Sequence, residues 1–299
     1  MKKLLIVGDA NPDLVLRGDV VPRFGQAEQL LDAADLVLGG SAAITACGAA
    51  RLGIPTRLIA AIGDDLYGRF VADTLAERGV TADLMVVDAG TGLSVVLSAG
   101  GGDRAILTLT GAISAVRGSD VNFGDAAHLH VSAYFLQPDL AADLPEVFAK
   151  ARAAGLTTSL DTNWDPAGRW SGVREVLAYT DVFLPNAAEL AAVTGTDDLV
   201  AGALDLVGAG TAVVLKDGAN GARAWWPGGS GASAGIAVDV IDTTGAGDSF
   251  NAGFLSGFLA GDPKPRCLAR AVSAGSLSTR AAGGIAAQAH PHEVDALIG

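Results

Sequence analysis

Short apolar runs alternate along this chain with longer stretches in which apolar residues recur at helical spacing. The runs predict buried strands at Leu4–Val7, Arg57–Ile62, His128–Val131, Thr157–Asp161, Val182–Leu184 and Thr211–Leu215. The helical spacing predicts helices at Ser41–Leu52, Tyr67–Arg78, Leu140–Ala154, Asn186–Val193, Ser249–Ala260, Cys267–Ala282 and His292–Ile298. Continuously apolar strands separated by helices are typical of a parallel sheet covered on both faces. The pattern therefore predicts a doubly wound α/β fold.

Two segments interrupt this alternation. Residues 14–37 mix charged and apolar positions without a helical period. Residues 92–109 contain two β-rich runs, Leu93–Ser98 and Ala105–Leu109, joined by the glycine-rich turn Gly100–Asp103, which predicts a hairpin. Strands inserted into a doubly wound domain predict a small lid rather than an independent unit. We therefore expect a single domain over the whole chain, with these two segments as its β-lid.

Composition narrows the classes of function. Half of the 299 residues are hydrophobic, and the formal net charge is −13. The acidic excess is spread along the chain without a basic patch, so we expect no nucleic-acid partner. The apolar run after Lys3 stops at Gly8, too short for a signal peptide, and no run approaches the roughly 18 apolar residues of a membrane span. With Cys47 and Cys267 both in apolar helical stretches, these features predict a cytoplasmic protein without membrane contact.

The stretch Asp242–Phe250 carries the candidate chemistry. Its sequence, Asp-Thr-Thr-Gly-Ala-Gly-Asp-Ser-Phe, runs directly into the predicted helix Ser249–Ala260. Gly245 and Gly247 let the backbone approach a ligand, and a helix N-terminus offers unpaired N–H groups at the positive end of its dipole. An anion site with Asp248 beside it indicates phosphoryl transfer, because that carboxylate can take a proton from an attacking hydroxyl.

Neither common nucleotide-binding motif accounts for this stretch. A dinucleotide fingerprint needs a third glycine, where this chain has Phe250, and it belongs near the start of a βαβ unit. None of the five lysines follows a glycine, so the chain contains no Walker loop. A nicotinamide-dependent oxidoreductase is therefore disfavoured, and an ATP site must be built in another way.

Five motifs together resemble the ribokinase-like, or PfkB, carbohydrate kinases. Asp242–Phe250 resembles the C-terminal signature of that family, and Gly39–Gly53 resembles its N-terminal signature, a Gly-Gly turn opening a helix that ends in Arg-Leu-Gly. The other three are Ile62-Gly63-Asp64-Asp65 with Gly68, Asn186-Ala187-Ala188-Glu189, and Lys216-Asp217-Gly218 with Gly221. The resemblance runs from about residue 4 to residue 290. It implies a ribokinase-like fold whose β-lid covers the sugar and often forms a homodimer.

The resemblance also implies catalytic and nucleotide-binding roles. Asp248 is the expected general base, while the backbone N–H groups of Gly245, Ala246 and Gly247 hold the transferring phosphoryl group. The expected nucleotide contacts are Asn186, Lys216, Gly218, Gly221, Thr243, Gly245 and Gly247. For Lys216 an ion pair with Asp217 is the other interpretation.

Metal roles follow from the same resemblance. Asn186 and Glu189 are expected to position Mg²⁺ through water, although this spacing also fits an N-cap with a capping box. Asp242 is expected to organise a loop that often holds a monovalent cation such as K⁺, with residues 281–286 opposite. The other interpretation of Asp242 is a turn-forming carboxylate.

At the acceptor end, the resemblance places Asn11 and Asp13 on sugar hydroxyls, with backbone approach at the glycine turn. The expected acceptor contacts are Asn11, Asp13, Gly39, Gly40, Ser41, Asp161 and Asn163. Ile44 departs from the family, which usually carries a sugar-contacting Asn there. We therefore expect an ATP- and Mg²⁺-dependent kinase that phosphorylates a hydroxymethyl group of a small sugar. A nucleoside kinase and a catalytically silent sugar- or nucleotide-binding protein are the alternatives.

Overall fold

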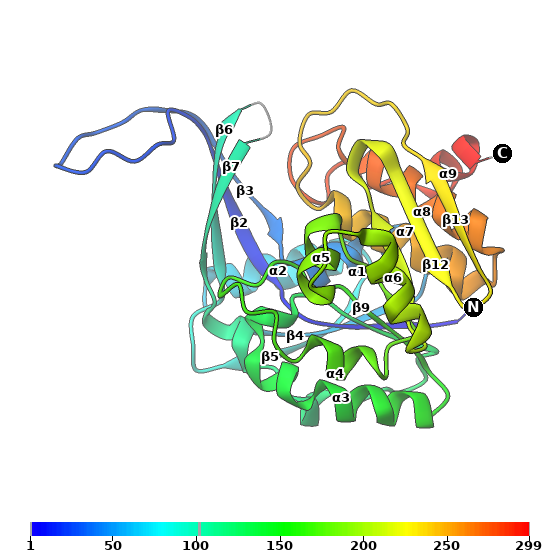
Figure 1. The fold of residues 1–299 in the computed structure, drawn as a ribbon. Coiled ribbons are helices and arrows are strands. Elements are labelled where there is room, and N and C mark those ends of the chain that lie inside the picture. Colours follow the sequence, from blue (N-terminus) through cyan, green and yellow to red (C-terminus); the bar gives the residue numbers. More distant parts are fainter. Residues whose placement is uncertain (1, 101–102, 299) are drawn as a thin grey trace.

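The computed structural model describes residues 2–100 and 103–298, which form a large sheet and a small one (Figure 1). The large sheet contains β1 (Leu4–Val7), β4 (Thr56–Gly63), β5 (Thr81–Val87), β8 (His128–Val131), β9 (Thr157–Leu160), β10 (Val182–Phe183), β11 (Ala212–Lys216), β12 (Gly221–Trp226) and β13 (Gly229–Ala234). Within the described ranges the strand order is β13-β12-β11-β10-β9-β8-β1-β4-β5. Only the β11–β12 and β12–β13 pairs of this sheet are antiparallel there. The predicted mostly parallel α/β sheet is thereby confirmed.

Helices cover both faces of the large sheet. They are α1 (Ser41–Arg51), α2 (Leu66–Glu77), α3 (Pro138–Ala153), α4 (Val173–Leu177), α5 (Ala187–Thr194), α6 (Leu199–Gly208), α7 (Ala246–Ala260), α8 (Lys264–Ser278) and α9 (Pro291–Ile298). Short 3-10 turns occur at Gly111–Ala115, Gly118–Asp120, Tyr134–Leu136 and Gly218–Asn220. Residues of α1, α2, α7, α8 and α9 share one buried core, and residues of α3 to α6 share the other.

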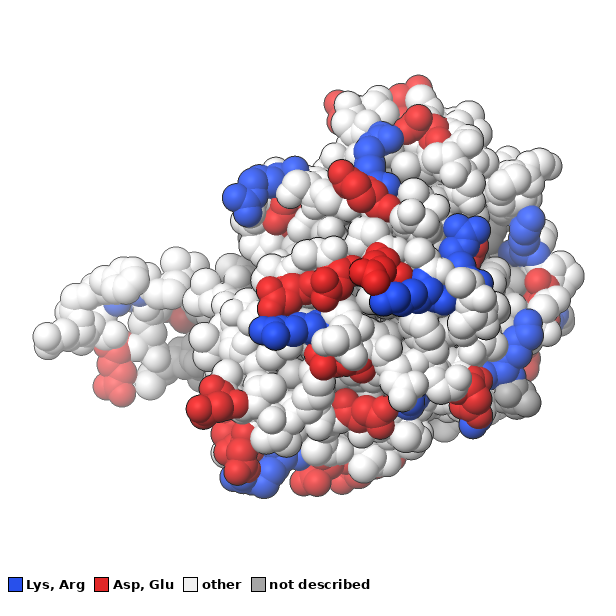
Figure 2. All heavy atoms as spheres, turned by 90° about the horizontal axis from the view of Figure 1, so that it is seen from below, with Lys and Arg blue, Asp and Glu red and all other residues white. Residues whose placement is uncertain are grey.

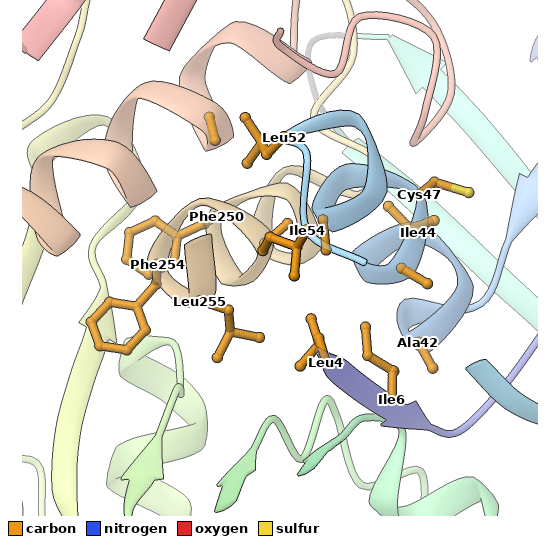
Figure 3. Close-up of a cluster of buried hydrophobic side chains, with 14 of the residues drawn as sticks. Leu4, Ile6, Ala42, Ile44, Cys47, Leu52, Ile54, Phe250, Phe254 and Leu255 are labelled. Carbon is orange, nitrogen blue, oxygen red and sulfur yellow. The ribbon is translucent and has the colours of Figure 1, made fainter. Parts of the chain in front are cut away.

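Strand β1 supplies side chains to both cores. Leu4 and Ile6 belong to the core under α1 and α7, whereas Leu5 and Val7 belong to the opposite one. Successive side chains of a strand point to opposite faces, so a strand covered on both sides must be apolar throughout. Figure 3 shows Leu4 and Ile6 below α1, with Leu255 of α7 nearer to Leu4 than Phe250 is. Each such buried side chain stabilises the fold by about 1.5–3 kcal/mol.

Small residues let α7 lie close to α8. A Cβ atom at Gly253 would stand 2.6 Å from the carbonyl oxygen of Arg270 and 2.7 Å from Cβ of Ala274. At Gly257 it would stand 3.1 Å from Sγ of Cys267. Helix α7 is buried over most of its length, so its N-terminus has a fixed position above the sheet.

The small sheet is the predicted lid. It contains β2 (Asn11–Gly18), β3 (Leu31–Gly39), β6 (Leu93–Gly100) and β7 (Asp103–Leu109), in the order β3-β2-β6-β7. The predicted hairpin is confirmed as the antiparallel β6–β7 pair; its turn residues Gly101 and Gly102 lie outside the described residues. The lid sheet is longer than the predicted segments, since it begins at Asn11 and includes Gly39. In Figure 1 it stands away from the body, and the β2–β3 connection reaches furthest.

Some elements differ from the sequence-based prediction. Strand β5 and helices α4 and α6 were not predicted. Strand β5 is an edge strand that is only partly buried, so its apolar pattern is weak. Helix α6 contains two glycines, yet the Asp198 carboxylate caps it by accepting hydrogen bonds from the N–H groups of Val200 and Ala201. Helix α8 ends at Ser278, earlier than the predicted Ala282.

Charges of both signs are interspersed on the surface. In Figure 2, which views the molecule from below relative to Figure 1, acidic and basic side chains alternate without a large basic area. Many are paired, such as Lys150 with Glu146 and Arg174 with Asp205. This face lacks the positive footprint of a nucleic-acid-binding protein. Within the described part of the chain, every helix is too short or too polar to cross a bilayer.

Candidate active site

The glycine-rich turn before α7 presents an uncapped helix N-terminus. Gly245 has the left-handed value φ 69° and precedes the first helical residue, Ala246, without a side-chain cap. A Cβ atom at Gly245 would stand 2.7 Å from Cα of Gly284, so the turn admits only glycine there. The first N–H groups of α7 lack intrahelical partners, and the helix dipole makes this end positive. The turn can therefore bind an anion.

Two cavities meet at this turn. One has a volume of about 620 Å³, and the turn residues that line it are Thr244, Gly245 and Asp248. The other has a volume of about 540 Å³ and is lined from the same turn by Thr243, Ala246 and Gly247. After the ligands that the sequence-based prediction expects in each, we call them the acceptor cavity and the nucleotide cavity. An anion bound at the α7 N-terminus would be accessible from both.

The Asp248 carboxylate lies at the acceptor side of the turn. It accepts a hydrogen bond from the Ser41 hydroxyl at the start of α1, so the N-termini of α1 and α7 meet here. Burial and, to a lesser extent, the nearby Asp161 carboxylate raise the pKa of Asp248 to about 8, although the bond from Ser41 opposes the shift. A carboxyl group with that pKa is suited to exchange a proton near neutral pH.

Lys216 ends β11 and points toward the same region. Its Nζ atom lies 2.6 Å from Oδ2 of Asp161, which also accepts a 2.6 Å hydrogen bond from the Asn251 side-chain amide. The alternative pairing with Asp217 is wrong, because Asp217 pairs with Arg223 at 3.2 Å. Gly247 lies against this lysine, since a Cβ atom there would be 3.7 Å from Nζ. A fixed cation thus stands behind the anion-binding turn.

Comparison with known proteins identifies the family. The family model described as "pfkB family carbohydrate kinase" matches residues 1–290. The chain belongs to the PfkB family of carbohydrate kinases. An "ATP-dependent ribose-1-phosphate kinase" of Halopiger xanaduensis is 33% identical over 93% of this chain and 92% of that protein. A "Fructokinase" of Klebsiella pneumoniae is 31% identical over 95% of each.

Solved structures confirm the ribokinase-like fold. Arabidopsis thaliana ribokinase complexed with ribose and ATP superposes with a TM-score of 0.86 at 24% identity, over 99% of this chain and 98% of that one. Adenosine kinase from Sinorhizobium meliloti gives a TM-score of 0.85 at 22% identity, over 95% of each chain. These likenesses establish the architecture of this PfkB kinase, including its lid.

The polar end of the acceptor cavity in this PfkB kinase is built on β2. Asn11 and Asp13 line it, and the Asn11 amide donates to Oδ1 of Asp13 over 3.1 Å. Burial raises the pKa of Asp13 to about 7, with the Asp9 carboxylate adding to the shift. Asp9 also lines the cavity and accepts from the backbone N–H of Ala42. Asp9 is a cavity residue that the sequence-based site list omitted, although its position directly after β1 marks it.

The remaining predicted acceptor residues divide into two groups. Gly40, Ser41 and Asn163 line the acceptor cavity. Gly39 and Asp161 do not: Gly39 leaves room for Asp13, whose Oδ1 would be 2.0 Å from an added Cβ, and Asp161 is fully buried with Lys216. Other cavity-lining residues missing from the prediction come from the lid, from the segments after β8 and β9, and from the turn before α7; they include Ser94, Arg104, Thr108, Ala133, Trp164 and Thr244.

Asn186 and Glu189 form the capping box at the start of α5. Oδ1 of Asn186 accepts from the Glu189 N–H over 2.9 Å, and Oε2 of Glu189 accepts from the Asn186 N–H over 2.8 Å. Burial raises the pKa of Glu189 to about 7, while the Lys216 ammonium opposes the shift. The capping interpretation is therefore confirmed. The magnesium role stays a prediction, and within the described ranges no cluster of three or more His, Cys, Asp or Glu residues offers a direct metal site.

Asp242 joins two loops. Its Oδ1 accepts from the N–H and the hydroxyl of Thr244, and its Oδ2 accepts from the N–H of Gly283 over 2.9 Å. The turn-forming interpretation is confirmed, and the predicted neighbour loop 281–286 is indeed adjacent. The role as a ligand of a monovalent cation stays a prediction.

The nucleotide cavity contains most of the predicted nucleotide-binding residues. Lys216, Gly218, Gly221, Thr243 and Gly247 line it, whereas Asn186 and Gly245 are absent from its wall. The opposite wall is formed by the Ile236–Val240 stretch and by α8, through Val272, Gly275 and Ser276. Its small and apolar residues suit a flat aromatic group at one end, with the α7 N-terminus at the other.

Proposed function

We propose that this PfkB kinase transfers the γ-phosphate of ATP to a hydroxymethyl group of a small sugar. The observation that carries the proposal is that the same anion-binding turn, before α7, lines both the acceptor cavity and the nucleotide cavity. The nucleotide cavity would hold ATP with its phosphates toward the α7 N-terminus, and the acceptor cavity would hold the sugar. A phosphoryl group at the turn could then pass from one ligand to the other without leaving its N–H donors.

The proposed roles follow from the positions of the side chains. Asp248 would take the proton of the attacking hydroxyl, which is worth about 10²–10⁴-fold in rate. The N–H groups at the start of α7 would stabilise the charge that develops on the phosphoryl oxygens. Asp13 and Asn11, at the far end of the acceptor cavity, would orient the sugar by hydrogen bonds to its hydroxyls.

The residues present fit ATP with Mg²⁺. The nucleotide cavity has room for a nucleotide, with Lys216 near the place of its phosphates. Mg²⁺ retains several waters and prefers oxygen ligands, so Glu189, which lines neither cavity, would act on the ion only through water. The metal would neutralise charge on the nucleotide phosphates. An Escherichia coli chain that superposes with a TM-score of 0.88 at 20% identity was solved with ATP and Mg²⁺.

The test measures ADP release from Mg-ATP with pentoses, hexoses, keto-sugars, ribose 1-phosphate, inositols and nucleosides. We expect turnover with at least one sugar. Asp248→Asn should lower kcat by roughly 10²–10⁴-fold, because the variant cannot accept the proton. Its affinity for ATP, followed by thermal shift, should stay near that of the wild type. Turnover comparable to wild type in the variant would refute the base assignment, and binding of sugar or nucleotide without turnover would favour the silent binding protein.

A nucleoside is the second candidate acceptor, and two observations favour it. Ile44 stands in the acceptor cavity where the family usually has a polar amide. Trp164, which is 61% exposed, lines the same cavity and offers a face for stacking. Turnover with nucleosides but not with free sugars would select this alternative.

A further inference from the structure

Arg104 connects the lid to the turn before α7. It lies on β7 and lines the acceptor cavity, and its Nη1 donates a 3.1 Å hydrogen bond to Oγ1 of Thr244. Thr244 directly precedes Gly245, where the anion-binding turn begins. Among the described residues that line this cavity, Arg104 is the one lysine or arginine. The lid thus places a guanidinium group beside the expected reaction centre.

Among the side chains that the structure describes, those of residues 2–99 and 104–298, Arg104 has no ion-pair partner. None of these carboxylates lies within 4.0 Å of its guanidinium, whereas the lid arginine Arg17 pairs with Asp35. Arg104 influences Asp13 and Asp242 only at longer range: its positive charge opposes the rise in the pKa of Asp13 and adds a small part to the lowering of the pKa of Asp242. Its one side-chain hydrogen bond within the described part of the chain goes to a neutral hydroxyl, which leaves most of its N–H donors for a ligand.

A positive charge on the acceptor side of the turn would offset the carboxylates that line the acceptor cavity. Asp9, Asp13 and Asp248 line the acceptor cavity, and an arriving phosphoryl group would face the negative charge of each one that is ionised. Lys216, on the other side of the turn, is already bound to Asp161. In phosphoryl transfer the negative charge spreads over the equatorial oxygens of the moving group, and a guanidinium can bind two of them at once.

We propose, on the basis of the function proposed above, that Arg104 binds the transferring phosphoryl group from the acceptor side. In this step the bond from phosphorus to the ADP oxygen breaks as the bond to the acceptor oxygen forms. The proton of the acceptor hydroxyl moves to Asp248, and Arg104 remains protonated throughout. Because Arg104 belongs to the lid, its positive charge lies beside the transferring phosphoryl group only when the lid covers the acceptor.

The experiment compares Arg104→Ala, Arg104→Gln and Arg104→Lys with the wild type in the sugar-kinase assay. Removal of the charge in the Ala and Gln variants should lower kcat by roughly 10²–10³-fold, with little change in the KM for ATP. Lys, which keeps the charge but loses the fork of donors, should retain more activity than Gln. Free guanidinium ions added at millimolar concentration should restore part of the kcat of Arg104→Ala and leave the wild type unchanged.

Arg17→Ala is the matched control, since Arg17 is a lid arginine that pairs with Asp35 and lies outside the acceptor cavity. It should keep the kcat of the wild type. If Arg104 only fastens the lid through Thr244, Gln would donate the same hydrogen bond and equal Lys, and guanidinium would rescue nothing. That result, or an unchanged kcat in Arg104→Ala, would overturn the proposal while leaving the kinase function intact. A wild type without ADP release for any acceptor would instead refute the proposed function.

Discussion

At the scale of single residues, the site depends on a few buried charges close together. Asp161 is fully buried, and Lys216 is its only ion-pair partner in the described residues. Breaking this ion pair would leave an unpaired buried charge, which is strongly unfavourable. The pairing therefore fixes the positions of both side chains. Asp248 has no such partner, and burial beside Asp161 shifts its pKa upward instead. The carboxyl group proposed as the base therefore has a raised pKa, which favours its taking a proton.

The raised pKa of Asp248 predicts the pH dependence of turnover. The ionised carboxylate must be present to accept a proton, and its folded-state pKa is about 8. We therefore expect kcat/KM to fall as pH falls below about 8 and to level off above it. Measurements of kcat/KM from pH 5 to pH 10 with saturating ATP would test this decline. A decline centred near pH 4 instead would show that the pKa of Asp248 is not raised.

Stability measurements check the same pKa independently. Because the folded-state pKa lies above the ordinary value of 3.8, the unfolded chain releases the Asp248 proton at lower pH than the folded protein does, and the fold loses stability as pH rises from about 4 to about 8. Asp248→Asn lacks this cost. Its melting temperature relative to the wild type should therefore increase between pH 4 and pH 8.

Asp13→Asn is the control for the kinetic measurement. It should keep the decline of kcat at low pH, because Asp13 is expected to bind the acceptor rather than take its proton.

At the scale of elements, the turn and α7 act as one unit. Gly245 needs its left-handed conformation to turn the chain, and Gly247 is already helical. The two glycines of the motif thus serve different purposes. One is required by the fold, and the other keeps the nucleotide cavity open.

Alanine substitutions should separate these purposes. Gly245→Ala should lower the free energy of unfolding by about 2 kcal/mol, since a left-handed alanine costs about 1–2 kcal/mol and its Cβ would clash with Gly284. Gly247→Ala should be neutral or stabilising by up to about 1 kcal/mol, because helices favour alanine and Cβ would find only ordinary contacts with Lys216. It should nevertheless raise the KM for ATP. Chemical denaturation and steady-state kinetics measure the two effects, and equal stability losses would contradict the assignment.

At the scale of the whole molecule, a rigid body carries a projecting lid. The body has two apolar cores, one on each face of the large sheet, whereas the lid has a thin sheet and much exposed apolar surface. On β7, Ile106 and Thr108 face the acceptor cavity. Leu107 and Leu109, which are 60% and 61% exposed, alternate with them and belong to the outer face. That apolar face is the part of the lid available to a second copy of the chain.

We predict a homodimer formed through the lid. Leu107→Lys should shift the protein toward monomer, because it places a charge in the outer apolar face while leaving the cavity side of β7 unchanged. Val86→Lys on β5, at a position that is 63% exposed, is the matched control and should not alter the assembly. Size-exclusion chromatography with light scattering measures the mass. A monomeric wild type, or a dimer that persists in Leu107→Lys, would contradict the prediction.

The sequence predicted most of the architecture because its signals are local. Apolar runs located the central strands β1, β8 and β9, and helical spacing located α1 and α7 close to their observed ends. The sequence did not predict the edge strand β5 or the glycine-containing helix α6, because secondary-structure propensity and hydrophobic periodicity are weak in both segments. Within the site, the structure places the motif residues Gly245, Ala246, Gly247 and Asp248 at the turn before α7, whereas Arg104 carries no motif and Asp9 only the position just after a strand, and their place at the cavity comes from the structure.

What the sequence alone determined is the fold class, the glycine-rich helix start and the presence of a carboxylate beside it, because each is encoded by residues that are neighbours in the chain. What only the tertiary structure decided is how the charges are paired and where the space lies. Lys216 binds Asp161 rather than its neighbour Asp217, and Ser41 reaches Asp248 across most of the sequence. Burial and Coulomb interactions depend on distances in space, and chain folding brings these distant segments together around two adjoining cavities.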